Sequence, residues 1–212
     1  MKIRQHGRYQ YSPIDSRPSY DWPDKKKLAF YIALNIEHFS FGEGLGHTPT
    51  HPGRQPDVRN FAWRDYGLRV GIWRIFDLLD ELDLPACHLM NSSIYDYAPE
   101  IPERIRQRGD EFVGHGRTNS EQQSDYGEDD ERTLIDEVVS IFKKYEGNGP
   151  DGWMGPWISE SDVTPDLLKE AGCRYIMDWP CDDQPIWMKT RSGPLLSIPY
   201  HIEINDSPAQ LT

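Results

Sequence analysis

The sequence predicts an α/β fold in which a parallel sheet alternates with helices. Short apolar runs typical of buried strands are separated by longer segments with apolar residues at helical spacing. The chain has 212 residues, a length that suits one domain with a sizeable core. A strand–helix alternation of this kind gives a sheet that is either open or closed into a barrel.

Each element can be placed in order along the chain. Residues 1–24 are polar and rich in Pro and Tyr, and we expect an N-terminal arm lying over a domain of residues 25–212. Strands are expected at 28–36, 86–90, 111–115, 153–154, 174–178 and within 194–201, and helices at 63–83, 99–108, 129–146 and 164–171. Residues 39–62 show no periodicity, and a loop of this length is typical of a functional segment.

Composition limits the classes of partner. The formal net charge is −12 and no basic stripe offsets it, which argues against nucleic acid. The three cysteines have neither disulfide nor zinc spacing, the N-terminus lacks a signal-like apolar region, and the longest apolar run is too short for a bilayer. We therefore expect a cytoplasmic protein with a small-molecule substrate and no nucleic-acid or membrane partner.

Polar side chains follow the predicted strands at the end where sites collect in parallel sheets. The first strand is followed by Glu37 and His38, and the third strand ends at His115. Further polar or aromatic candidates near these strand ends are Asn35, Asn119, Trp153, Pro156, Trp157, Glu160 and Asp183. Groups far apart in sequence are thus expected to meet at one rim of the sheet.

Four stretches, at 65–74, 114–116, 152–157 and 177–185, carry a family resemblance through their order along the chain. Over roughly residues 10–206 the chain resembles the polysaccharide deacetylase (NodB-homology) superfamily and, within it, the allantoinase-like branch associated with urate and purine breakdown. The resemblance implies a distorted (β/α) barrel, possibly incomplete at the C-terminus. It also implies hydrolysis of a carbon–nitrogen bond other than a peptide bond.

The resemblance also implies site roles, with departures from the family pattern. Glu37 falls where the family has its general-base Asp, and a longer carboxylate can still take a proton from water. His38 falls at the ligand Asp, His115 matches the first ligand His, Asn119 replaces the second, and Met154 stands where the family has an Arg. An amide oxygen is a poor zinc ligand, and catalytic zinc needs three good ligands. We therefore expect no cofactor, with zinc at His38, His115 and Asn119 as the alternative.

In a metal-free reaction the resemblance makes Glu37 the base and His115 the group that stabilises the oxyanion or protonates the leaving nitrogen, a role that His38 could share. The candidates for substrate contact are Asn35, Trp153, Pro156, Trp157, Glu160 and Asp183. Structural roles compete with each of these: a solvated carboxylate for Glu37, a strand-end contact for His38, and core packing for the tryptophans.

Three functions stay open at this point. The first is hydrolysis of a cyclic amide or ureide such as allantoin. The second is metal-dependent deacetylation of N-acetylated sugars. The third is a degenerate protein that binds a carbohydrate or metabolite without turnover. A C-terminal Leu-x-x-His motif of the family has no match in the sequence, and exposed barrel edges would favour homo-oligomers.

Overall fold

The computed structural model describes residues 3–43 and 56–205. They form a seven-stranded sheet in the order β1-β2-β3-β4-β5-β7-β6, in which only the β6–β7 pair is antiparallel. The strands are β1 (Ala33–Ile36), β2 (Cys87–Met90), β3 (Glu111–Gly114), β4 (Gly152–Trp153), β5 (Tyr175–Ile176), β6 (Ile186–Thr190) and β7 (Gly193–Ser197). The predicted α/β class is confirmed.

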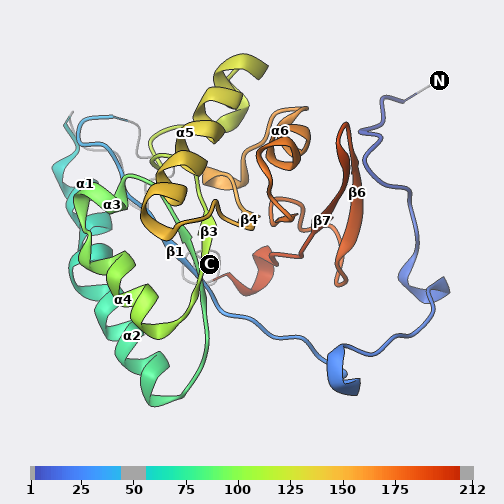
Figure 1. Ribbon diagram of the computed structural model, residues 1–212, viewed down its shortest axis with the longest axis horizontal. Coiled ribbons are helices and arrows are strands. Elements are labelled where there is room, and N and C mark those ends of the chain that lie inside the picture. The colour runs from blue at the N-terminus through green and yellow to red at the C-terminus, as the bar shows by residue number, and fades with distance from the viewer. Residues whose placement is uncertain (1–2, 44–55, 206–212) are drawn as a thin grey trace.

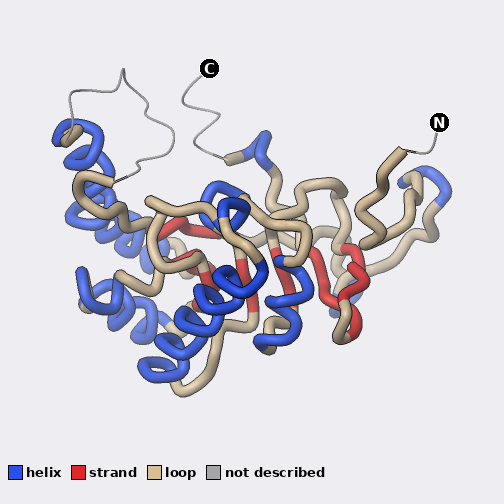
Figure 2. Tube along the Cα trace, turned by 90° about the horizontal axis from the view of Figure 1, so that it is seen from above, coloured by secondary structure: helices blue, strands red, loops and turns tan. Residues whose placement is uncertain are grey.

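Helices run along one side of the row of strands and loops along the other (Figure 2). The α-helices are α1 (Val58–Tyr66), α2 (Ile72–Glu81), α3 (Ile94–Tyr97), α4 (Glu100–Arg108), α5 (Glu128–Glu146) and α6 (Thr164–Ala171). A π-helical turn, η3 (Gly67–Gly71), joins α1 to α2, and the 3₁₀ turns are η1 (Ile14–Ser16), η2 (Pro23–Lys25), η4 (Gln123–Asp125), η5 (Pro156–Ile158) and η6 (Ile202–Ile204).

Two predicted boundaries were wrong. The first helical segment begins at Val58 rather than at residue 63, because the carboxylate of Asp57 accepts a hydrogen bond from the Asn60 backbone N–H and caps the helix. The first strand spans only Ala33–Ile36, and Leu28 and Phe30 are 78% and 76% exposed. Part of the predicted loop at 39–62 is therefore helix α1, while its residues 44–55 lie outside the described residues.

The two faces of the sheet bury different side chains, as the two-residue period of a strand requires. Met90, Trp153 and Ile176 pack in the larger cluster with residues of the helices, whereas Leu89 and Val113 belong to a second cluster. This second cluster also contains Met154, Met177 and Tyr200, which lie beyond the strand ends. The second face therefore provides an apolar layer directly beneath the strand ends, where a site is expected.

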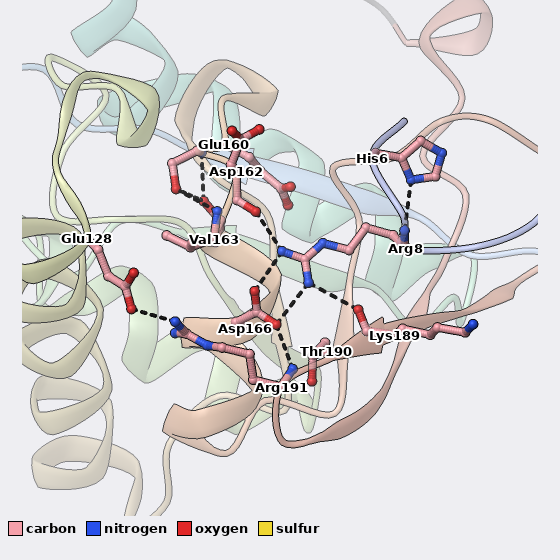
Figure 3. A network of polar contacts seen from close by, with 12 residues as sticks. His6, Arg8, Glu128, Glu160, Asp162, Val163, Asp166, Lys189, Thr190 and Arg191 are labelled. Atoms are coloured by element: carbon pink, nitrogen blue, oxygen red, sulfur yellow. Dashed lines mark hydrogen bonds and ion pairs between the residues drawn. The ribbon is translucent and has the colours of Figure 1, made fainter. Parts of the chain in front are cut away.

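The arm passes beside β6 and then beneath the sheet to β1 (Figure 1). Its best-anchored residue is Arg8, whose guanidinium donates to both carboxylate oxygens of Asp166 at 2.9 and 2.7 Å (Figure 3). The same group donates to the backbone oxygens of Lys189 and Asp162 at 3.1 and 2.6 Å. The arm thus docks on α6 and β6 through one largely buried ion pair.

None of the described helices has the length and apolar character needed to cross a bilayer.

Candidate functional site

The register of the parallel strands brings four loops to one edge. Ile36 pairs with Met90, Met90 with Gly114, and Gly114 with Trp153. The next residue along each strand therefore falls in a row at the carboxyl edge: Glu37, Asn91, His115 and Met154. Side chains far apart in sequence meet here because parallel strands end together at this edge.

Asn91 connects the loops at this edge through hydrogen bonds of its side-chain amide. Its Oδ1 accepts a hydrogen bond from the His38 backbone N–H at 2.7 Å, and its Nδ2 donates to Asn119 Oδ1 at 3.0 Å and to the backbone oxygen of His115. The backbone N–H of Asn119 donates in turn to the His38 oxygen at 2.8 Å. One buried amide thus ties the loops that carry Glu37 and His115 to each other.

His115 is held as a single tautomer. Its side chain is buried, and its Nδ1 lies 2.6 Å from the backbone oxygen of Met154. A carbonyl oxygen can only accept, so Nδ1 must carry the hydrogen. Its Nε2 lies 3.8 Å from Glu37 Oε1 and has no hydrogen-bond partner among the described residues. The free lone pair of His115 therefore faces the carboxylate of Glu37.

The glycines on both sides of His115 allow this close packing. A Cβ at Gly114 would lie 2.5 Å from Cε3 of Trp153, and a Cβ at Gly116 would lie 2.7 Å from Cγ of Pro156. Gly116 also has φ +65°, which favours glycine. The Gly-His-Gly sequence thus allows His115 to approach the backbone oxygen of Met154, which accepts from its Nδ1.

Glu37 lies at a large cleft. Its side chain is 32% exposed and contributes to the lining of a cleft of about 1370 Å³. Asn35, Arg64 and Tyr200 line the same space, and Asn35 Nδ2 donates to the Tyr200 hydroxyl at 2.8 Å. The cleft is large enough for a small-molecule substrate beside Glu37.

A cation lies close to this carboxylate. The guanidinium of Arg64 is 4.3 Å from the ring centroid of Phe39 and 5.9 Å from that of Trp157. Burial lowers the pKa of Arg64, and the negative charge of Glu37 acts in the opposite direction. Arg64, from α1, therefore supplies positive charge near Glu37. The sequence motifs did not assign this role to Arg64, because the family's Arg falls at position 154, where this chain has Met154.

The residues predicted as metal ligands do not fit a zinc site. His38 Nδ1 lies 2.9 Å from Ser93 Oγ, and its ring stacks on Tyr97 with centroids 4.2 Å apart. Asn119 uses its Oδ1 to accept from Asn91. Within residues 3–43 and 56–205, no group of three or more His, Cys, Asp and Glu side chains could hold a metal ion. These three side chains therefore do not supply the three good ligands that catalytic zinc needs, and no step below uses a metal.

The predicted substrate-contact residues separate into two groups. Asn35 and Asp183 line the cleft, whereas Trp153, Pro156, Trp157 and Glu160 do not. Trp157 adopts φ +64°, an unusual value for a tryptophan, and its indole N–H donates to the Asn119 backbone oxygen at 2.9 Å, while Pro156 packs against Gly116. Backbone strain of this kind is often found at functional sites.

Two of these predictions need correction. Trp153 is fully buried in the core, and its indole N–H donates to Gln123 Oε1 at 2.8 Å. Glu160 accepts from the Trp179 indole at 2.7 Å and lies against Asp178. Neither side chain lines the cleft, because the alternation of the strand and the turn after it direct them into the protein.

Comparisons with known proteins agree with this geometry. No family model matches the chain. The chain is 23% identical, over 92% of its length and 68% of the relative's, to a Schizosaccharomyces pombe protein named "Putative polysaccharide deacetylase". It is 27% identical to a peptidoglycan deacetylase of Helicobacter pylori over 50% of this chain and 36% of that protein.

A solved structure of the allantoinase PuuE superposes on this chain with a TM-score of 0.77 and 27% sequence identity. The match covers 90% of this chain and 68% of the allantoinase, so the chain spans about two thirds of that relative. The motif order, the fold and these relatives together show that the chain is similar to the polysaccharide deacetylase (NodB-homology) superfamily.

Proposed function

We propose that this protein hydrolyses a carbon–nitrogen bond of a cyclic amide or ureide such as allantoin. The observation that carries the proposal is the 3.8 Å separation of Glu37 Oε1 and His115 Nε2 beside the cleft. The carboxylate of Glu37 lines the cleft and can bind a water there, and the buried Nε2 of His115 lies directly behind this carboxylate. The likeness to an allantoinase, at 27% identity, supports this substrate class.

The chemistry follows from the two side chains. Glu37 takes a proton from the water, whose oxygen attacks the carbonyl carbon of the substrate. Glu37 passes this proton to the free lone pair of His115 Nε2. The carbon–nitrogen bond then breaks as the departing nitrogen takes the proton from Nε2, so the reaction consumes one water and both side chains return to their starting state. Met154 holds Nδ1–H throughout, and Arg64 supplies positive charge near Glu37 that favours the oxyanion.

Glu37→Gln tests the proposal. Because a positioned general base contributes about 10²–10⁴ in rate, we expect turnover to fall by that factor with substrate binding retained. Glu81→Gln, on the exposed end of α2, is the matched control and should behave as the parent. The assay is turnover of a panel of ureides and N-acetyl sugars, with and without added divalent metal.

Each other function predicts a different result in the same assay. Turnover of N-acetyl sugars that a chelator abolishes would favour a metal-dependent deacetylase. Ligand binding without turnover of any ureide or acetamide by the parent protein would favour a non-catalytic binding protein. Either result would overturn the ureide hydrolase.

A further inference from the structure

One peptide group connects His115 to a carboxyl group outside the cleft. The oxygen of the Met154–Gly155 peptide accepts from His115 Nδ1 at 2.6 Å, and its N–H donates to Asp178 Oδ1 at 2.7 Å. Because the C=O and N–H of one peptide polarise together, a stronger acceptor at Asp178 strengthens the bond that fixes His115.

A second carboxyl group lies beyond Asp178. Glu160 and Asp178 are within hydrogen-bonding reach of each other, and the Trp179 indole N–H donates to Glu160 Oε2 at 2.7 Å. Glu160 Oε1 and Asp178 Oδ2 are both buried, and no N–H or O–H of the described residues bonds them. Two adjacent buried carboxyl groups cannot both be ionised without a large cost in free energy. A single proton shared between Glu160 Oε1 and Asp178 Oδ2 avoids that cost and gives both oxygens a hydrogen-bond partner.

The charges around the pair favour a proton on Asp178. Burial and the charge of Glu160 raise the pKa of Asp178 well above its usual value, whereas burial raises the pKa of Glu160 only to about 7. Glu131, from α5, adds negative charge and is itself bonded by Gln123, Ser161 and Thr164.

Two further charged groups face the two ends of this connection. Arg8, from the arm, is the cation that acts on Glu160, and its guanidinium is already bound to Asp166 (Figure 3). Glu37 faces the opposite end, at His115 Nε2. The pair therefore has a distant cation and no direct cationic partner among the described residues.

We infer that His115, the 154–155 peptide, protonated Asp178 and ionised Glu160 form a hydrogen-bond chain in which every donor points toward Glu160, so that Glu160 and Asp178 are positioning residues for His115. Negative charge on Glu160 makes Asp178 Oδ1 a better acceptor for Gly155 N–H, and the Met154 oxygen then binds Nδ1–H more strongly. His115 Nε2 is left as the atom that exchanges protons. The inference deepens the proposed function, because it rests on His115 being the working group.

Two conservative variants separate this chain of bonds from a packing role. In Asp178→Asn the amide keeps an oxygen for Gly155 N–H and places an N–H toward Glu160, so it reproduces protonated Asp178. Glu160→Gln removes the terminal charge and places an uncharged amide beside Asp178 and the Trp179 N–H. Asp151→Asn, an exposed carboxylate bonded to Arg174, is the matched control.

The first measurement is NMR of the His115 ring, which reports the Nδ1–H hydrogen bond without any substrate. Because the Met154 oxygen can only accept, we expect every variant to keep the Nδ1–H form. The Nδ1–H proton signal should be unchanged in Asp178→Asn and Asp151→Asn and should move upfield in Glu160→Gln, where this hydrogen bond is weaker. A direct Asp–His bond is worth about 10⁴ in kcat. With a peptide and a second carboxyl group between Glu160 and His115, we expect Glu160→Gln to lower kcat for the ureide by about 10-fold, with KM within about twofold.

Infrared spectroscopy gives an independent measurement on the parent protein. At pH 8, above the pKa of about 7 of Glu160, Glu160 and the exposed carboxyl groups are ionised, and the parent should show a buried carboxylic-acid C=O band that Asp178→Asn lacks. Absence of this band in the parent, or unchanged His115 signals in Glu160→Gln, would overturn the inference. An equal loss of kcat in Asp178→Asn and Glu160→Gln would also overturn the inference. A shifted Nδ1–H signal in Glu160→Gln without ureide turnover by the parent would instead refute the proposed function and leave the chain of bonds standing.

Discussion

Removing the Arg8 side chain should loosen the N-terminal arm on α6 and β6 and destabilise the protein, although Arg17 still pairs with Asp182. Arg8 and Asp166 are 12% and 7% exposed, and the guanidinium makes four hydrogen bonds to Asp166, Lys189 and Asp162. Loss of one partner of a buried pair costs about 3–5 kcal/mol. Arg191 N–H still donates to Asp166 at 2.7 Å, and water can reach Asp166 once the arm lifts. We therefore expect Arg8→Ala to cost about 3 kcal/mol, at the lower end of that range.

The measurement is urea unfolding at several pH values. Since m-values for small domains are about 1–3 kcal/mol/M, the midpoint should fall by about 1–3 M. Burial alone would raise the pKa of Asp166, but the bonds from Arg8 and Arg191 outweigh it and the pKa is lowered. The folded protein therefore gains stability from this carboxylate above the ordinary aspartate pKa of about 3.9. The difference between parent and variant should shrink as the pH falls below that value.

Arg4→Ala is the control, because Arg4 pairs with Asp162 while both side chains are more than 80% exposed, at 82% and 83%. An exposed pair of this kind contributes little, so its midpoint should stay near that of the parent. An Arg8→Ala protein that unfolds like Arg4→Ala at pH 7 would refute the docking of the arm through Arg8.

Two further predictions concern the core. Asp110 accepts from His88 Nε2 at 2.9 Å and Arg108 Nε at 2.7 Å, and these bonds outweigh burial and lower its pKa. Asp110→Asn should cost about 1–3 kcal/mol in urea unfolding at pH 7 and less near pH 3; a constant difference would contradict the charged pair. Gly114→Ala should cost about 1–3 kcal/mol, because its Cβ meets buried Trp153. Gly127→Ala, with open space and φ −73°, is its control, and equal unfolding midpoints would rule out the clash.

The regular alternation of strands and helices was predictable from the sequence, and some element ends were not. Helix α6 matches its predicted range 164–171, because Pro165 near its start and Gly172 after its end are local signals. The apolar run 28–36 carries no signal for where strand pairing begins. Pairing with β2 starts only at Ala33, because the register depends on a segment some fifty residues away.

The candidate site shows the same division between local and long-range information. Glu37 and His115 were found because each directly follows a recognisable strand. Arg64 was missed although it lies just before the 65–74 stretch, because its contact with Phe39 depends on how α1 packs. Asn91 had a visible signal, a polar residue at a strand end, but its three hydrogen bonds depend on loops that sequence alone does not place.

The departures from the deacetylase pattern fit together as one arrangement, which argues against a merely degenerate site. Asn119 stands where the family has a second ligand His, and three of its four polar groups have the following partners: Oδ1 accepts from Asn91, the backbone N–H donates to His38, and the backbone oxygen accepts from Trp157. A site that had only lost a ligand would be expected to leave such groups unsatisfied. Here the amide fixes the loop that carries His115, and Arg64 brings the positive charge that Met154 cannot supply. The residues at the family's ligand positions therefore help to hold the loops that carry Glu37 and His115, as the proposed hydrolysis by water requires.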